Sequence, residues 1–159
     1  MWKDGLLQTT LCYLERDGCY LMLHRIKKEK DVNRDKWIGV GGKFEPGEDA
    51  LTCVHREVRE ETGYEMHHPQ YRGMVDFYCP PWEPERMHLY TCDEFSGTPA
   101  DCDEGVLEWV PKEKVCELPI WEGDKIFFDL LNRNAPFFHL ELYYEGNQLQ
   151  KAVLDGRTL

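Results

Sequence analysis

Alternating hydrophobic and polar positions predict strands along most of this chain, and two stretches have the spacing of amphipathic helices. Two apolar runs near the N-terminus flank Asp17-Gly18, a dipeptide typical of a two-residue hairpin turn. The break at residues 45–48 is followed by apolar residues at helical spacing, and Gly63 is expected to end that helix.

The expected strands cover residues 7–15, 19–25, 37–40, 71–79, 86–93, 106–110, 137–144 and 149–155. The expected helical segments cover residues 48–62, 112–117 and 121–132. The last two strands are predicted to form a hairpin turning at Gly146-Asn147, and the chain contains no repeat or linker. We therefore predict one domain over residues 1–159, of α/β (α+β) class, with a mixed sheet and two substantial helices rather than a doubly wound fold.

Composition and charge narrow the function classes. The hydrophobic fraction of 42% and the charged fraction of 31% fit a globular protein. We expect a cytoplasmic location, because no leader-like N-terminus or membrane-length apolar stretch is present. The net charge of −11 argues against long nucleic acids as partners. Residues 25–36, with six basic and three acidic side chains, form either a solvated loop or a basic lip for a small anion.

The seven cysteines do not predict a zinc site or a disulfide framework. Their number is odd, and no CxxC pair occurs. We expect most of them to be reduced and at least partly buried.

The helix predicted after residue 48 carries Glu57, Glu60 and Glu61 on one face, because side chains three and four positions apart are neighbours. Its apolar stripe is formed by Ala50, Val54 and Val58, with Leu51 beside it. Like charges at this spacing repel, and Arg56, about 100° around the helix from Glu57, is poorly placed to bridge all three. Clustered carboxylates suit Mg²⁺ or Mn²⁺, although a solvated acidic face has the same spacing.

The surrounding residues decide between these interpretations. Gly42, then Glu48, then residues 56–64 (REVREETGY) match every specified position of the Nudix box, so this chain resembles a Nudix hydrolase. The resemblance implies a mixed sheet between helices, an α/β/α sandwich, with the box as a loop–helix–loop. It also implies divalent-metal-dependent cleavage of a nucleoside diphosphate linked to another group.

The resemblance assigns roles to residues of the box. Glu57, Glu60 and Glu61 would ligate Mg²⁺ and act in catalysis, and Gly42 would bring backbone to the metal and phosphates. The structural positions of the motif are Glu48, Arg56 and Gly63. Lys43 and Arg25 would attract the substrate's phosphates.

Beyond the box, the chain is similar to the oxidised purine nucleoside triphosphatases of this family. Glu104 matches a loop glutamate that approaches the metals, as a ligand or base, and the choice of general base between Glu61 and Glu104 stays open. Trp121 and Asp124 match residues that contact the base. Two polar base contacts are missing, because Gly123 and Ile38 replace an aspartate and an asparagine.

The leading hypothesis is a pyrophosphohydrolase that converts a purine (deoxy)nucleoside triphosphate, such as 8-oxo-dGTP, to the monophosphate and pyrophosphate. Alternatives within the family are dinucleoside polyphosphates, nucleotide sugars and RNA 5′ ends. A non-catalytic nucleotide-sensing module and a plain structural domain are further alternatives. The partner is expected to be a small nucleotide, and the protein a monomer or homodimer.

Overall fold

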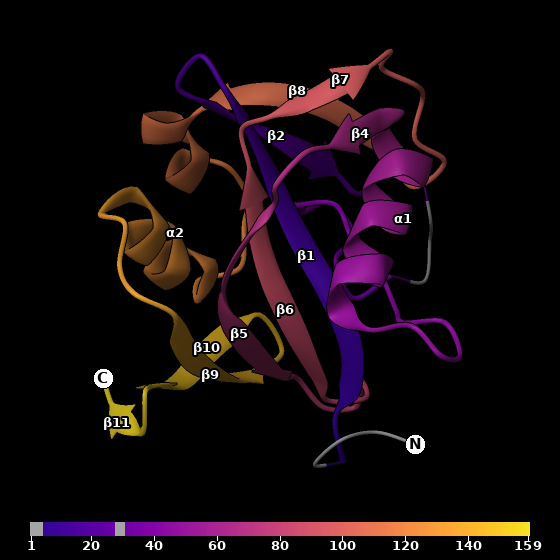
Figure 1. Cartoon of the computed structure of the whole chain (residues 1–159). Coiled ribbons are helices and arrows are strands. Elements are labelled where there is room, and N and C mark those ends of the chain that lie inside the picture. Colours follow the sequence, from indigo (N-terminus) through magenta and orange to yellow (C-terminus); the bar gives the residue numbers. More distant parts are fainter. Residues whose placement is uncertain (1–4, 28–30) are drawn as a thin grey trace.

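The computed structural model describes residues 5–27 and 31–159, and in it two α-helices flank a β-sheet (Figure 1). The strands are β1 Leu7–Arg16, β2 Cys19–His24, β3 Trp37–Ile38, β4 Tyr64–Met66, β5 Gln70–Tyr78, β6 Glu85–Cys92, β7 Phe95–Gly97, β8 Val106–Pro111, β9 Phe138–Glu145, β10 Gln148–Leu154 and β11 Arg157–Thr158. The helices are α1 Ala50–Thr62, the 3-10 helix η2 Lys112–Glu117, and α2 Asp124–Asn132.

The main sheet is mixed, as predicted. Within the described residues it has nine strands in the order β11-β10-β9-β5-β6-β1-β2-β3, with β8 paired to the other edge of β2. The pairs β1/β6 and β5/β9 are parallel, and the remaining pairs are antiparallel. β4 and β7 form a separate small sheet near one end of α1 (Figure 1).

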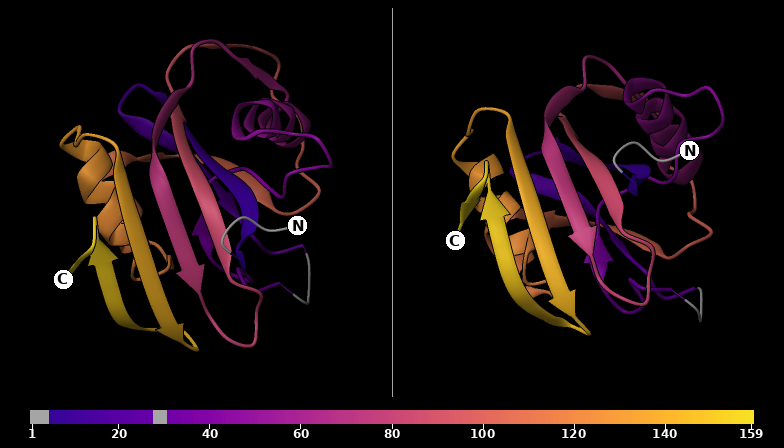
Figure 2. Two further views of the ribbon diagram at one scale, coloured as in Figure 1. Left: turned by 60° about the horizontal axis from the view of Figure 1, so that its bottom comes forward. Right: turned by 90° about the horizontal axis from the view of Figure 1, so that it is seen from below.

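Alternate residues of β1 face two different hydrophobic clusters. Leu11 and Tyr13 point into the cluster that contains the phenylalanines of α2, while Cys12 and Leu14 point into the cluster that contains the valines of α1. A strand side chain reverses direction at each residue, so this central strand supports both layers. The two helices accordingly lie on opposite faces of the sheet, which confirms the α/β/α sandwich (Figure 2).

Helix α1 begins two residues later than predicted and ends where predicted. The Asp49 carboxylate accepts the Thr52 amide at 2.8 Å and caps the helix. Glu48 therefore lies outside the helix, and Gly63, with φ of 81°, closes it. Leu51, expected beside the apolar stripe, is 48% exposed because it lies on the outer face. That expectation was wrong.

The start of α2 and the shortest strands also differ from prediction. The helix was expected from Trp121, but residues 121–123 form a turn and the helix begins at Asp124. The strands β4, β7 and β11 were not predicted, because two or three residues are too few to give a readable alternation.

The C-terminal hairpin of β9 and β10 turns where predicted and shares the core of the molecule. β9 pairs in parallel with β5, and its side chains Leu140 and Leu142 are fully buried. All seven cysteines are free thiols, and only Cys116 is exposed. Among the described residues, no helix is long and apolar enough to span a membrane.

Candidate active site

The glycine segment after β3 lies between β1 and the C-terminal half of α1. The Thr10 amide donates to the Gly42 carbonyl at 2.9 Å, and the Gly41 amide donates to Glu61 Oε2 at 2.8 Å. A Cβ on Gly42 would lie 2.7 Å from the Glu57 carboxyl carbon, so a larger residue here would displace that carboxylate. Because the Gly42 carbonyl is turned to β1, its predicted role as a metal ligand gains no support from the geometry.

Arg56 holds the acidic residues of the loop and helix together. Its Nε lies 2.7 Å from Glu48 Oε2, and a second nitrogen contacts Glu57 at 2.7 Å and Glu60 at 3.2 Å. Hydrogen bonding to Arg56 lowers the pKa of Glu48 to about 2. As expected, Arg56 does not bridge all three helix glutamates: it contacts Glu57 and Glu60, and among the described contacts it makes none with Glu61.

Glu61 and Glu104 approach one another across the site. Glu61 is 7% exposed, and among the described residues its Oε1 has no hydrogen-bond partner. Arg25 contacts Glu104 at 2.8 Å. Burial, together with the neighbouring Glu104, raises the pKa of Glu61, and burial also raises the pKa of Glu57. Close packing of these carboxyl groups therefore favours a bound cation or a retained proton at the site.

The predicted carboxylates are not equally placed. Glu57 and Glu104 line the large cavity of the molecule, with Glu61 packed beside them. The Glu60 side chain is 59% exposed and lies outside the lining of that cavity. The structure thus brings Glu57, Glu61 and Glu104 together, with Glu60 at the outer edge.

The cavity has a volume of about 850 Å³. Its wall includes residues predicted to bind the metal, such as Glu57, and residues predicted to bind the base, such as Trp121. Its wall contains the predicted substrate-binding residues Arg25, Ile38, Lys43, Trp121 and Asp124. A pocket of this size is within the range of small-molecule sites.

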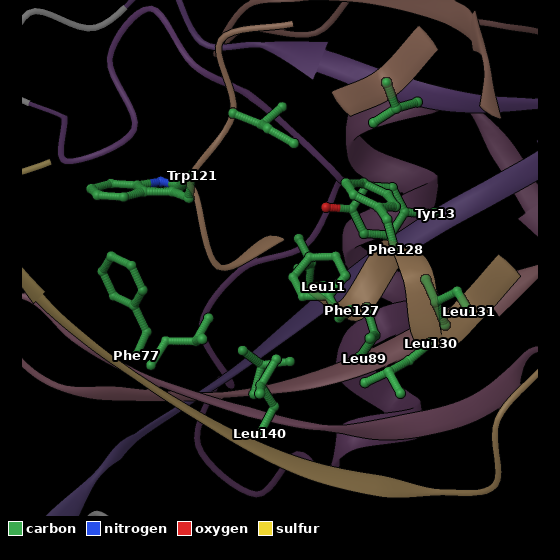
Figure 3. Close-up of a cluster of buried hydrophobic side chains, with 14 of the residues drawn as sticks. Leu11, Tyr13, Phe77, Leu89, Trp121, Phe127, Phe128, Leu130, Leu131 and Leu140 are labelled. Atoms are coloured by element: carbon green, nitrogen blue, oxygen red, sulfur yellow. The ribbon is translucent and has the colours of Figure 1, made fainter. Parts of the chain in front are cut away.

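Trp121 belongs to the hydrophobic core and to the cavity wall at once. It is 4% exposed, and its ring meets those of Phe77 and Tyr144 edge-on, with centroids 4.9 Å apart. Figure 3 shows Trp121 beside Phe77. The indole nitrogen donates to Asn33 at 2.7 Å, and the Lys36 ammonium lies 4.5 Å from the ring centroid. These contacts fix the plane of the indole before any ligand binds.

Asp124 is a buried carboxyl group at the first turn of α2. Burial raises its pKa to about 8, opposed by the charge of Lys36. It is therefore protonated near neutral pH and can donate a hydrogen bond. The neighbouring Gly123 is dictated by packing, because a Cβ there would lie 2.5 Å from Leu142.

The basic segment of residues 25–36 is less available to a ligand than its charge indicates. Arg25 is shared between Asp31 and Glu104, and the Lys27 ammonium donates to the Cys102 carbonyl at 2.6 Å. Lys28 and Lys30, which contribute to the predicted basic lip, lie outside the described residues.

Comparison with protein families identifies the family of this chain. The family model described as NUDIX domain matches residues 7–131, which cover β1 to β8, α1 and most of α2. This chain is a Nudix hydrolase, an enzyme that acts on phosphoanhydride bonds.

Individual relatives agree with this family. The uncharacterized Nudix hydrolase YvcI of Bacillus subtilis is 29% identical over 139 residues, with 84% of each chain covered. The oxidized purine nucleoside triphosphate hydrolase of Danio rerio is 28% identical over 111 residues, covering 69% of this chain and 71% of the relative. The crystal structure of a mutator MutT protein from Bacillus halodurans superposes with a TM-score of 0.82 at 28% identity, covering 94% and 98% of the two chains.

Nudix hydrolases generally use a divalent metal and act on small nucleotides, and the donor set of this Nudix hydrolase fits a hard cation. Carboxylate oxygens are the ligands such ions prefer, and the unpartnered Glu61 Oε1 is a buried acceptor for which the described protein supplies no donor.

Sequence reasoning missed several residues of this Nudix site. They are Thr9, Asn33, Lys36, Phe77, Glu85 and Cys102. Glu85, for example, begins β6, accepts the Thr9 hydroxyl at 2.9 Å and lines the cavity. Only its polarity at the start of an apolar strand could have indicated it. Cys102 could have been noticed as a thiol two positions before Glu104.

Proposed function

We propose that this Nudix hydrolase is a Mg²⁺-dependent pyrophosphohydrolase that converts a purine (deoxy)nucleoside triphosphate to the monophosphate and pyrophosphate. One observation carries the proposal: a single cavity is walled both by Glu57 and Glu104 and by Trp121 and Asp124. Carboxylates that suit a metal–phosphate group and an aromatic site that suits a base therefore share one space. The name of the 28% identical relative from Danio rerio supports a purine triphosphate.

Three carboxylates would hold the cation at the phosphate side. Glu61 and Glu104 lie close together there, Glu57 lines the same cavity, and the exposed Glu60 would complete the set from the outer edge. When bound, Mg²⁺ (or Mn²⁺) supplies positive charge to the phosphate oxygens and lowers the pKa of the attacking water. Arg56 orients Glu57, and Lys43 adds a positive charge on the cavity wall.

A carboxylate must also accept the proton of the attacking water. Glu61 and Glu104 are the two candidates for this base. Burial and the neighbouring Glu104 raise the pKa of Glu61, and Glu104 lines the cavity. The protein's contribution to this step is a base held in place by the Gly41 amide or by Arg25.

The base would lie against Trp121, with the protonated Asp124 donating to an acceptor on its edge. Ile38 offers no polar contact where an asparagine would. Oxidised guanine is the leading base. The alternatives are dinucleoside polyphosphates, nucleotide sugars and RNA 5′ ends, of which RNA is disfavoured by the net charge of −11.

A nucleotide panel tests this proposal. Normal and oxidised purine triphosphates, pyrimidine triphosphates, dinucleoside polyphosphates and nucleotide sugars are compared by kcat/KM with Mg²⁺. We expect purine triphosphates to rank first. A nucleotide sugar or dinucleotide ranking first would contradict the proposal.

Two variants separate the base contacts from the chemistry. Trp121→Phe keeps a ring in the core and should raise KM for purine triphosphates more than it lowers kcat. Ile38→Asn adds a polar group at the base and should alter the ratio of kcat/KM between oxidised and normal guanine, by about tenfold for a contact of 1–3 kcal/mol. Unchanged values in both variants would place the base elsewhere.

A further inference from the structure

A buried thiol lies beside the carboxylates of the site. Glu61, Cys102 and Glu104 each offer one ligand atom, and these atoms all lie within 4.8 Å of one another. Cys102 is 3% exposed, so protein atoms rather than solvent surround its side chain. It reaches this position from the loop before β8, two residues ahead of Glu104.

One member of this group is an incompletely bonded acceptor. Glu61 is 93% buried, and its Oε2 accepts the Gly41 amide while Oε1 has no hydrogen-bond partner among the described residues. A buried carboxylate oxygen without a donor is unfavourable unless a cation or proton satisfies it. Glu61 Oε1 therefore favours a bound cation or a proton held between Glu61 and Glu104, and this observation does not depend on the cysteine.

The neighbouring basic side chains do not occupy the group. Arg25 contacts Glu104 Oε2 at 2.8 Å and divides its guanidinium with Asp31. The Lys27 ammonium donates to the backbone carbonyl of Cys102, not to its thiol. Of the two basic side chains, Arg25 pairs with Glu104 and Lys27 binds a backbone carbonyl. The ligand atoms of Glu61 and Cys102 lie within 4.8 Å of each other.

We propose that Cys102 Sγ joins Glu61 and Glu104 as a third ligand, so that this site binds a thiophilic divalent cation such as Co²⁺, Zn²⁺ or Cd²⁺. Metal–sulfur bonds of about 2.3 Å and metal–oxygen bonds of about 2.0–2.2 Å place the ligand atoms of a tetrahedral site about 3.4–3.6 Å apart. The three ligand atoms lie within 4.8 Å of one another, so side-chain rotation would have to bring them to that spacing. Binding releases the thiol proton to solvent, because the thiolate is the ligand.

The consequence is a difference in metal preference. Mg²⁺ takes oxygen ligands and gains little from sulfur, whereas softer ions bind thiolate strongly. The inference rests on the proposed placement of the metal at these carboxylates and not on the proposed substrate. It predicts that a soft ion competes with Mg²⁺ at Glu61 and Glu104.

Cobalt titration of the metal-free, full-length protein without nucleotide tests this inference. The wild-type protein should develop the near-ultraviolet thiolate-to-cobalt charge-transfer band. Cys102→Ser and Cys102→Ala should lose the band, with Cd²⁺ affinity falling about 10–100-fold and Mg²⁺ affinity changing little. Near-ultraviolet circular dichroism establishes that the variants are folded.

Cys92→Ser is the matched control. Cys92 is 2% exposed, and its thiol donates to the backbone carbonyls of His67 and Glu94. This variant should keep the band. A band that persists in both Cys102 variants, or no band in the wild-type protein, would overturn the inference. Since the titration contains no nucleotide, either result leaves the proposed triphosphate hydrolysis to be judged by its own assay.

Discussion

Asp124 is the residue whose physical state matters most for choosing a base. It lies buried at the start of α2, beside Trp121 on the cavity wall, and burial holds its pKa near 8. A carboxyl group kept neutral in this way can donate a hydrogen bond, which an ionised carboxylate cannot. The same burial makes ionisation of Asp124 costly for the folded state.

Asp124→Asn should therefore stabilise the protein increasingly as pH rises. A group with a raised folded-state pKa contributes stability that is present below its unfolded pKa and is lost as pH rises through the folded pKa. For Asp124 this loss runs from about pH 4 to about pH 8. Even half of the shift corresponds to about 2–3 kcal/mol at pH 8. Urea unfolding of both proteins between pH 4 and pH 8 measures the difference.

Asp129→Asn is the control for that series. Asp129 lies on the same helix, but its side chain is 72% exposed and pairs with Arg133 at the surface. Its substitution should change stability little at any pH. If the difference in free energy of unfolding between the wild-type protein and Asp124→Asn stayed constant up to pH 8, Asp124 would be ionised throughout.

At this scale, motif matching predicted Glu57, Glu61, Trp121 and Asp124, and the structure places all four in or beside one site. Their roles remain proposals. Other contacts depend on the tertiary fold, because Asn33 and Lys36 contact Trp121 although they lie far from it in the sequence. No local pattern encodes such a meeting.

Helix α1 is joined to the preceding loop by ion pairs rather than by apolar contact alone. Arg56 contacts Glu48 in the loop and Glu57 on the helix, and so fixes the helix face that carries the carboxylates. Glu48 immediately precedes Asp49, the N-cap residue, and so lies outside α1. It still stabilises the helix through its contact with Arg56.

Glu48→Gln should destabilise the protein by about 1.5–3 kcal/mol near neutral pH, the range for hydrogen bonds to charged groups. The lowered pKa of Glu48 means that its contribution is present above the unfolded pKa and is lost as pH falls toward about 2. Thermal unfolding of wild-type and variant proteins should thus converge on acidification.

Glu65→Gln provides the comparison, because Glu65 pairs with Arg59 at 3.4 Å and both side chains are at least half exposed. It should cost under about 1 kcal/mol. An equal cost for the two variants would mean that the Glu48–Arg56 pair acts only as a surface pair.

Helices and strands were predictable where the hydrophobic pattern extends over many residues or a turn or cap residue marks the end. The terminal hairpins and the end of α1 at Gly63 matched the structure, because turn residues and a helix cap mark them locally. The β4/β7 sheet was missed, since its three-residue strands are stabilised by pairing across about 30 residues of sequence.

The whole molecule includes more than the part matched by the family model. That match ends at residue 131, yet β9 follows it, pairs with β5 and adds Leu140 and Leu142 to the core. Tyr144 of the same strand packs against Trp121, with ring centroids 4.9 Å apart. We therefore propose that residues 1–159 fold as one unit.

A chain ending at residue 136 should lose its cooperative unfolding transition, because it exposes the core face that β9 covers. A chain ending at residue 155, which lacks only the exposed β11 and its flanks, should unfold nearly as the full chain does. Calorimetry distinguishes these outcomes. A sharp transition in the shorter chain would make the C-terminal hairpin an independent addition.

We propose that Glu57, Glu61 and Glu104 together promote release of pyrophosphate from a purine triphosphate. Quantifying pyrophosphate and orthophosphate released by wild-type protein and Glu61→Gln, with and without Mg²⁺, tests it most directly. We expect pyrophosphate and monophosphate in equal amounts from the wild-type protein, only with Mg²⁺, and a rate at least about 100-fold lower in the variant. Orthophosphate as the product, or an undiminished rate in Glu61→Gln, would contradict the account.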